Sequence, residues 1–231
     1  MQRKIAIMGD SHTRSFAHIS NTIPVFLSSG STINLDDKFY LGVSEKIKKV
    51  YSEISEIESD VVFFLYLGEP NVRYQLNNDW YVHWDKKFIY DGSINKKYLD
   101  KCLDNYRKII DSLDFYPYVI TPTTAFNPSL PSLKYFNLNL KRQFGERVVD
   151  IYTDTIDRET GTVKESLRDP NFERDPIHLN SSISRIFFKR VVESGIINDT
   201  EPFVISKEFC SLDPEIKGSF SISQFGTYCL K

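Results

Sequence analysis

The chain has 231 residues, of which 41% are hydrophobic and 26% are charged, and its formal net charge at pH 7 is −2. This composition excludes disorder over any large part of the chain. The near-neutral charge excludes a global basic field of the kind that holds nucleic acid or an anionic membrane. The longest apolar run, residues 61–67, is far too short to span a bilayer. We therefore expect a folded domain that binds neither nucleic acid nor membrane.

The start of the chain and its cysteines predict a cytoplasmic protein. Only residues 5–8 form an apolar stretch near the N-terminus, and they lack the length and the cleavage site of a secretory signal. The cysteines are three in number, at Cys102, Cys210 and Cys229, an odd count for a disulfide framework. We expect reduced thiols, with a Cys210–Cys229 pair in the tail as the alternative.

Strand and helix patterns alternate along the chain, which indicates an α/β fold. Short apolar segments predict strands at residues 4–8, 23–27, 60–67, 118–121 and 148–152. A turn followed by a helix is expected over 10–19, and apolar positions at helical spacing predict helices over 43–57, 98–113, 133–144 and from 180 or 181. The almost wholly apolar segment 60–67 is typical of a central parallel strand. We expect a mostly parallel sheet of about five strands with helices on both faces.

Two stretches fall outside this alternation. Residues 70–95 form an aromatic insertion that contains Trp80 and Trp84, and the residues from 201 onward are strand-prone without helical periodicity. We therefore predict one α/β domain over residues 1–200, with the insertion at 70–95, and a C-terminal extension over 201–231. If the protein is a homo-oligomer, the extension is where we expect a second copy to pack.

The first candidate motif is Gly9-Asp10-Ser11-His12, directly after the first predicted strand. A nucleophilic serine needs a tight turn between strand and helix, where its hydroxyl is exposed and the helix N-terminus stabilises developing negative charge. The alternative is that the motif is only a good turn and helix cap.

The second candidate motif is Asp175-Pro176-Ile177-His178, in a loop that leads into the last predicted helix. An imidazole can take the proton of a serine, and a carboxylate can fix its tautomer and stabilise the imidazolium. The alternative is that Asp175 is a turn residue ahead of Pro176 and that His178 is incidental.

The third candidate motif is Gly68-Glu69-Pro70-Asn71, just after the apolar strand. The glycine would let the backbone approach a substrate closely, and Asn71 could donate an amide N–H to an oxyanion. The alternative is a plain turn that ends the strand.

Together these motifs resemble the consensus blocks of the SGNH (GDSL-type) hydrolase family, which hold a catalytic Ser, a Gly, an Asn and a His. The resemblance implies a three-layer α/β/α sandwich of the SGNH/flavodoxin-like kind and acyl-ester chemistry. It assigns Ser11 as nucleophile with Asp175 and His178 as partners. It also implies an oxyanion hole made by the backbone N–H groups of Ser11 and Gly30 with the side chain of Asn71.

The third block departs from the family's Gly-x-Asn-Asp pattern, because Pro70 stands where the Asn is expected. The stretch is closer to a variant, Gly-Glu-Ile-Asp-Cys-Arg, of bacterial SGNH-like proteins encoded among surface-polysaccharide genes. Those proteins also begin Gly-Asp-Ser-His and end Asp-x-x-His-Leu-Asn. Glu69 and Arg73 match that variant, so the third oxyanion donor is Asn71, Arg73 or neither.

Other histidines compete with His178 as the base. His12 is adjacent to Ser11 but points about 100° away from it on a helix, so we expect it to shape the pocket rim or cap the turn. His18 is expected on a helix surface, and His83 in a loop, with substrate contact as its alternative. The spacing of histidines and cysteines predicts no metal site, and no glycine-rich nucleotide-binding loop is present in the sequence.

Two functions follow from these motifs. The first is a serine-dependent esterase or O-acyltransferase that acts on small acyl groups, such as acetyl, of a carbohydrate or other small-molecule ester. It needs no cofactor, and acetyl-CoA would be the acyl donor of a transferase. The second is a non-catalytic binding or assembly protein that retains the fold.

Overall fold

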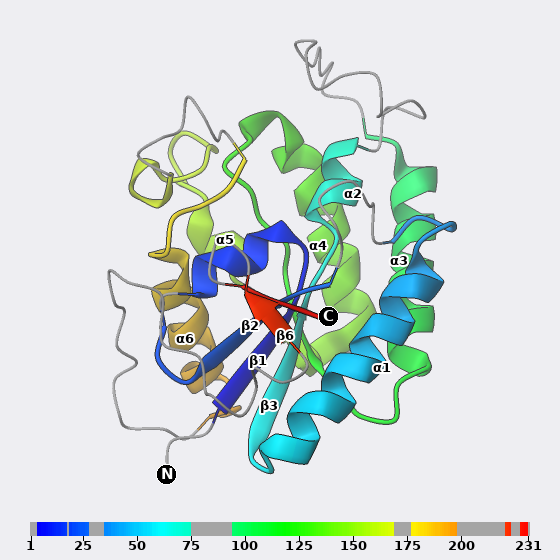
Figure 1. Cartoon of the computed structure of the whole chain (residues 1–231). Coiled ribbons are helices and arrows are strands. Elements are labelled where there is room, and N and C mark those ends of the chain that lie inside the picture. Colours follow the sequence, from blue (N-terminus) through cyan, green and yellow to red (C-terminus); the bar gives the residue numbers. More distant parts are fainter. Residues whose placement is uncertain are drawn as a thin grey trace.

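The computed structural model describes residues 4–17, 19–27, 35–74, 94–168, 177–197, 220–222 and 227–230. It shows an α/β protein with a seven-stranded, mostly parallel sheet in the order β5-β4-β3-β1-β2-β7-β6 (Figure 1). The strands are β1 (Lys4–Gly9), β2 (Thr22–Phe26), β3 (Val61–Tyr66), β4 (Tyr118–Ile120), β5 (Val148–Val149), β6 (Phe220–Ile222) and β7 (Tyr228–Leu230). The α-helices are α1 (Tyr40–Ile57), α2 (Glu69–Tyr74), α3 (Lys96–Asp111), α4 (Leu130–Phe144), α5 (Tyr152–Thr155) and α6 (Ile183–Glu193). Short 3₁₀ helices include η1 (Ser11–Phe16).

Helices pack against both faces of the sheet. Consecutive side chains of a strand point to opposite faces, and β3 shows this with two neighbouring phenylalanines. The ring of Phe63 contacts Tyr51 of α1 at a centroid distance of 5.0 Å. The ring of Phe64 contacts Phe187 of α6 at 5.1 Å. Helices α1 and α6 therefore lie on opposite sides of β3, and α3 packs against both α1 and α4 (Figure 1).

The centre of the sheet is formed by β1 and β3, which explains why their sequences are almost wholly apolar. The side chains from Ile5 to Met8 are fully buried, and β1 pairs in parallel with β2 on one side and β3 on the other. The predicted helices are present at 43–57, 98–113 and 133–144, with ends shifted by a few residues. Among the described residues, no helix is long and apolar enough to cross a membrane.

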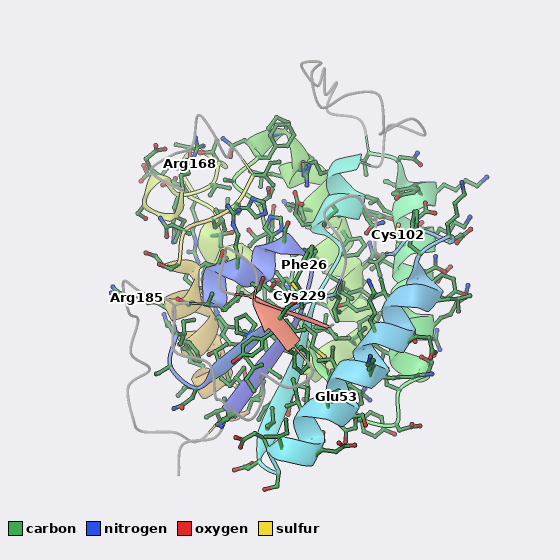
Figure 2. The ribbon with its side chains drawn as sticks, viewed as in Figure 1. Phe26, Glu53, Cys102, Arg168, Arg185 and Cys229 are labelled. Atoms are coloured by element: carbon green, nitrogen blue, oxygen red, sulfur yellow. The ribbon has the colours of Figure 1, made fainter. Side chains whose placement is uncertain are left out.

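The predicted strand count was wrong, because two segments of the predicted C-terminal extension belong to the sheet. Strand β7 pairs in parallel with β2, with Phe26 opposite Cys229, and Figure 2 shows these two residues next to each other. Strand β6 pairs antiparallel with β7 at the edge. Each of these strands has only three residues, too few to show a recognisable alternation in the sequence. The helix predicted over 10–19 is also shorter, since only η1 forms there.

Candidate active site

Ser11 is the first residue of η1 and follows the carboxyl end of the central strand β1. The tight connection depends on Gly9, because a Cβ at that position would lie 2.1 Å from the carbonyl oxygen of Tyr66 on β3. Asp10 caps η1, and its Oδ1 accepts the backbone N–H of His12 at 3.0 Å. The Gly-Asp-Ser sequence is therefore a helix cap, as its turn-forming residues predict, and it also presents the serine at the edge of the sheet.

The hydroxyl of Ser11 lies within hydrogen-bond distance of the histidine from the second motif. The distance from Ser11 Oγ to His178 Nε2 is 2.8 Å, across 167 positions of sequence. Both residues are partly buried. A neutral imidazole at this distance can accept the hydroxyl proton as the oxygen attacks an electrophile.

The segment that carries His178 is anchored on both sides of that residue. The carbonyl oxygen of Ile177 accepts a hydrogen bond from Thr124 Oγ1 at 2.9 Å. The carbonyl oxygen of Leu179 accepts one from Ser15 Oγ, also at 2.9 Å. Because Thr124 follows β4 and Ser15 lies in η1, two elements hold the histidine in place. Such anchoring restricts the position of the imidazole relative to Ser11.

His12 is buried next to His178, with only 2% of its surface exposed. Its Nδ1 is 3.0 Å from Asp10 Oδ1, and its Nε2 is 3.8 Å from Glu69 Oε2. Its ring lies 4.5 Å from the ring of His178, with 33° between the two planes. His12 thus interacts with two carboxylates and with the rings of His178 and Tyr66, and none of these interactions involves the hydroxyl of Ser11.

Glu69 and Arg73 form a buried ion pair within α2. Arg73 donates from Nε to Glu69 Oε1 at 2.9 Å and from Nη2 to Oε2 at 3.2 Å, and Glu69 is 1% exposed. Gly68, directly before this helix, has a φ of +112°, a backbone conformation that favours glycine. The residues that match the variant third block therefore bind each other behind the site.

The charges of this group shift two pKa values. Burial lowers the pKa of His12, but the carboxylates of Glu69 and Asp10 oppose this effect, and the net pKa lies above its ordinary value of 6.5. Burial raises the pKa of Glu69, but the Arg73 guanidinium and His12 outweigh it, so the net pKa lies below its ordinary value. The raised pKa of His12 and the lowered pKa of Glu69 both favour a charged imidazolium next to a charged carboxylate.

Asn71 is fully buried, and its side chain holds the backbone of a neighbouring loop. Its Oδ1 accepts the N–H of Leu35 at 3.2 Å, and its Nδ2 donates to the hydroxyl of Tyr98 at 3.3 Å. The carbonyl of Leu35 in turn accepts a hydrogen bond from Asn105 Nδ2 at 3.0 Å. Asn71 thus anchors the backbone of Leu35, and these hydrogen bonds do not involve Ser11.

Several predicted site residues lie outside the described part of the chain, namely Asp175, Gly30, His18 and His83. Conversely, the sequence interpretation gave no role to Asp10, Ser15 or Thr124, which support Ser11 and His178. Asp10 could have been found from its position as a helix cap. Ser15 and Thr124 could not be found from the sequence, because each donates a hydrogen bond to a backbone carbonyl that is distant along the chain. In the described part, no group of three or more His, Cys, Asp or Glu side chains could hold a metal ion.

The site thus consists of a serine and a histidine at hydrogen-bond distance, next to a set of buried charged side chains. This arrangement is chemically suited to proton transfer from a hydroxyl nucleophile. Comparison of the chain with protein-family models, with curated proteins and with solved structures gives no match.

Proposed function

We propose that the protein is a serine-dependent acyl-ester enzyme, an esterase or O-acyltransferase of the SGNH kind, with Ser11 as its nucleophile. The observation that carries the proposal is the 2.8 Å distance from Ser11 Oγ to His178 Nε2. Two residues far apart in the sequence meet at this distance only because the segment before α6 is anchored beside η1.

The reaction follows from these two side chains. His178 Nε2 takes the proton of Ser11 as Oγ attacks the carbonyl carbon of the ester, and the tetrahedral intermediate carries the charge on the former carbonyl oxygen. His178 then gives the proton to the departing alkoxide, which leaves an acyl group on Ser11. Water or a sugar hydroxyl attacks this acyl-enzyme after losing its own proton to His178, and the proton finally returns to Ser11 Oγ.

The topology supports the same location for the site. The first five strands have the spatial order β2-β1-β3-β4-β5, which is the flavodoxin-like order of doubly wound sheets. In such sheets, ligands bind at the carboxyl ends of the strands where the order reverses, here between β1 and β3. Ser11 follows β1 and Glu69 follows β3 closely. We propose accordingly that the fold is the three-layer α/β/α sandwich of the SGNH family, extended by β6 and β7.

The proposed substrates are small acyl esters of carbohydrates, with acetyl as the acyl group. This choice rests on the resemblance of the Gly-Glu-x-x-x-Arg block and of the terminal motifs to proteins encoded among surface-polysaccharide genes. Acetyl-CoA would be the donor for a transferase, and water the acceptor for an esterase.

The test is hydrolysis of p-nitrophenyl acetate by the purified protein. We expect Ser11→Ala to lower kcat/KM by about a thousandfold or more, because the nucleophile is removed. Ser52→Ala, which removes an exposed hydroxyl from α1, should leave the rate unchanged. Activity that survives Ser11→Ala would contradict the assignment of the nucleophile, whereas a folded wild-type protein without activity would favour a binding or assembly protein. Adding acetyl-CoA and a sugar acceptor then separates transfer from hydrolysis, since a transferase acetylates the acceptor without faster release of acetate.

A further inference from the structure

Four ionisable side chains form a buried charge cluster behind the proposed nucleophile: Asp10, His12, Glu69 and Arg73. The two carboxylates are 3% and 1% exposed, and His12 is 2% exposed. Arg73 supplies one positive charge, held by Glu69 through two hydrogen bonds. With His12 neutral, the cluster would bury a net negative charge, whereas a charged His12 brings its sum to zero. Buried charges are costly unless they are compensated, so charge balance favours the imidazolium.

The hydrogen bonds of Asp10 place a proton on the ring of His12. Asp10 Oδ1 accepts the backbone N–H of His12 and lies 3.0 Å from its Nδ1. Because an ionised carboxylate oxygen can only accept, Nδ1 must carry hydrogen. The second nitrogen, Nε2, is buried without a hydrogen-bond partner and lies 3.8 Å from Glu69 Oε2. A proton on Nε2 thus faces a carboxylate.

The ring of His12 is also the immediate neighbour of the proposed base, at 4.5 Å between ring centroids. A positive charge at this distance disfavours a second positive charge on His178. The other groups that face His12 are Arg73 and the edge of the Tyr66 ring, and neither carries a negative charge at neutral pH. The carboxylate of Glu69 also interacts with His178 and favours its protonation. The charge on His12, whose ring contacts that of His178, opposes it.

We propose that His12, held as an imidazolium between Asp10 and Glu69, is a positioning residue that keeps His178 neutral and packed with its Nε2 toward Ser11 Oγ. This inference deepens the proposed function, on which its catalytic meaning rests. A neutral His178 can accept the serine proton. Once His178 is protonated, repulsion from His12 favours transfer of that proton to the leaving group.

The first measurement uses the wild-type protein and needs no activity. NMR of the histidine ring nitrogens reports which rings are protonated, and His18→Gln and His83→Gln variants help to assign the four histidines. We expect His12 to be doubly protonated at pH 7 and His178 to be neutral. A neutral His12 ring at pH 7 would overturn the proposal.

The second measurement compares His12→Gln with Lys48→Gln by the same NMR titration. Both variants remove one positive charge, but Lys48 lies on the outer side of α1, with its side chain 39% exposed. We expect His12→Gln to raise the titration midpoint of His178 by about one pH unit, because a nearby like charge is lost. Lys48→Gln should leave it in place. An unchanged midpoint of His178 in a folded His12→Gln protein contradicts the proposal. If this variant does not fold, the wild-type NMR spectrum still tests whether His12 is charged and His178 neutral at pH 7.

Activity provides the link to catalysis. The acid limb of the kcat/KM profile should move upward in His12→Gln together with the NMR midpoint of His178. A uniform fall in rate without movement of the limb would show that His12 has only a structural role. If Ser11→Ala leaves activity intact, the proposed function fails, whereas the NMR titration still decides whether His12 controls the charge of His178.

Discussion

The Glu69–Arg73 pair has the i,i+4 spacing of an ordinary surface ion pair, but its carboxylate is almost completely buried. Glu69→Gln would keep the shape of the side chain and remove a buried negative charge that both Arg73 and His12 face. We expect the free energy of unfolding to fall by about 3 kcal/mol, since removal of one partner leaves buried charge uncompensated. Urea unfolding monitored by circular dichroism measures this loss.

The matched control is Glu45→Gln, also within a helix and also paired with a basic residue. The Glu45 side chain is 74% exposed and pairs with Lys48 three residues later. Exposed pairs contribute less than about 1 kcal/mol, so this variant should unfold almost like the wild type. Equal effects of the two substitutions would show that Glu69 is not a compensated buried charge.

Single residues also show how far the sequence could predict the site. Ser11 and His178 were named from short motifs, because their chemistry needs particular residue types at a strand end and before a helix. The burial of His12 and Glu69 could not be predicted in the same way. Charged residues at helical spacing usually indicate a solvated face, and only the packing of α2 against the turn after β1 removes them from water.

At the scale of elements, the close approach of β1 and β3 determines where the serine turn begins. A Cβ on Gly9 would meet the carbonyl oxygen of Tyr66 at 2.1 Å, and a backbone atom cannot move away cheaply. We expect Gly9→Ala to lower the free energy of unfolding by about 3 kcal/mol, at the upper end of the cost of overpacking. Thermal and urea unfolding would measure this change.

Gly42→Ala in α1 is the control for that substitution. No atom lies within 4 Å of the place where its Cβ would be, and the residue is exposed within a helix. Alanine should therefore stabilise the protein by about 0.5–1 kcal/mol, because glycine is a poor helix former. Effects of the same sign at the two positions would contradict the steric explanation for Gly9.

Elements with a long, regular pattern were predictable, and short ones were not. The apolar spacing of α1 and α3 marks the face that each helix buries, and the continuous apolar runs of β1 and β3 mark strands buried on both faces. The position of β7 depends on pairing with β2, which is distant in the sequence. Three residues carry too little pattern to specify that partner.

At the scale of the whole molecule, strand order and site position have one cause. The chain places β2 on one side of β1 and then crosses to place β3 on the other side. The turn with Ser11 and the start of α2 therefore follow neighbouring strands at the same carboxyl edge, where His12 Nε2 and Glu69 Oε2 lie 3.8 Å apart. The sequence showed the alternation of strands and helices, but the order of strands is a property of the folded sheet.

The buried charge cluster also makes the stability of the whole protein depend on pH in two directions. The pKa of Glu69 in the folded protein lies below its ordinary value of 4.5. The stabilisation that its negative charge gives the fold is therefore complete above pH 4.5, and it is lost as the pH falls through the pKa of Glu69 in the folded protein. The pKa of His12 in the folded protein lies above its ordinary value of 6.5. The stabilisation that its positive charge gives the fold is therefore complete below pH 6.5, and it is lost as the pH rises through the pKa of His12 in the folded protein. Between pH 4.5 and pH 6.5 the charges of Glu69 and His12 therefore both stabilise the fold fully.

We therefore expect the difference in unfolding free energy between wild type and His12→Gln to be largest from pH 4.5 to 6.5. The difference should shrink as the pH rises further, because the unfolded chain loses its histidine proton before the folded protein does, and deprotonation of His12 in the folded state then removes the favourable charge. Urea unfolding of both proteins across this range measures the curve, with Lys48→Gln as a charge-matched control whose difference from wild type should stay flat. A difference that grows above pH 6.5 would mean that His12 is buried neutral, since a lowered pKa gives the opposite slope.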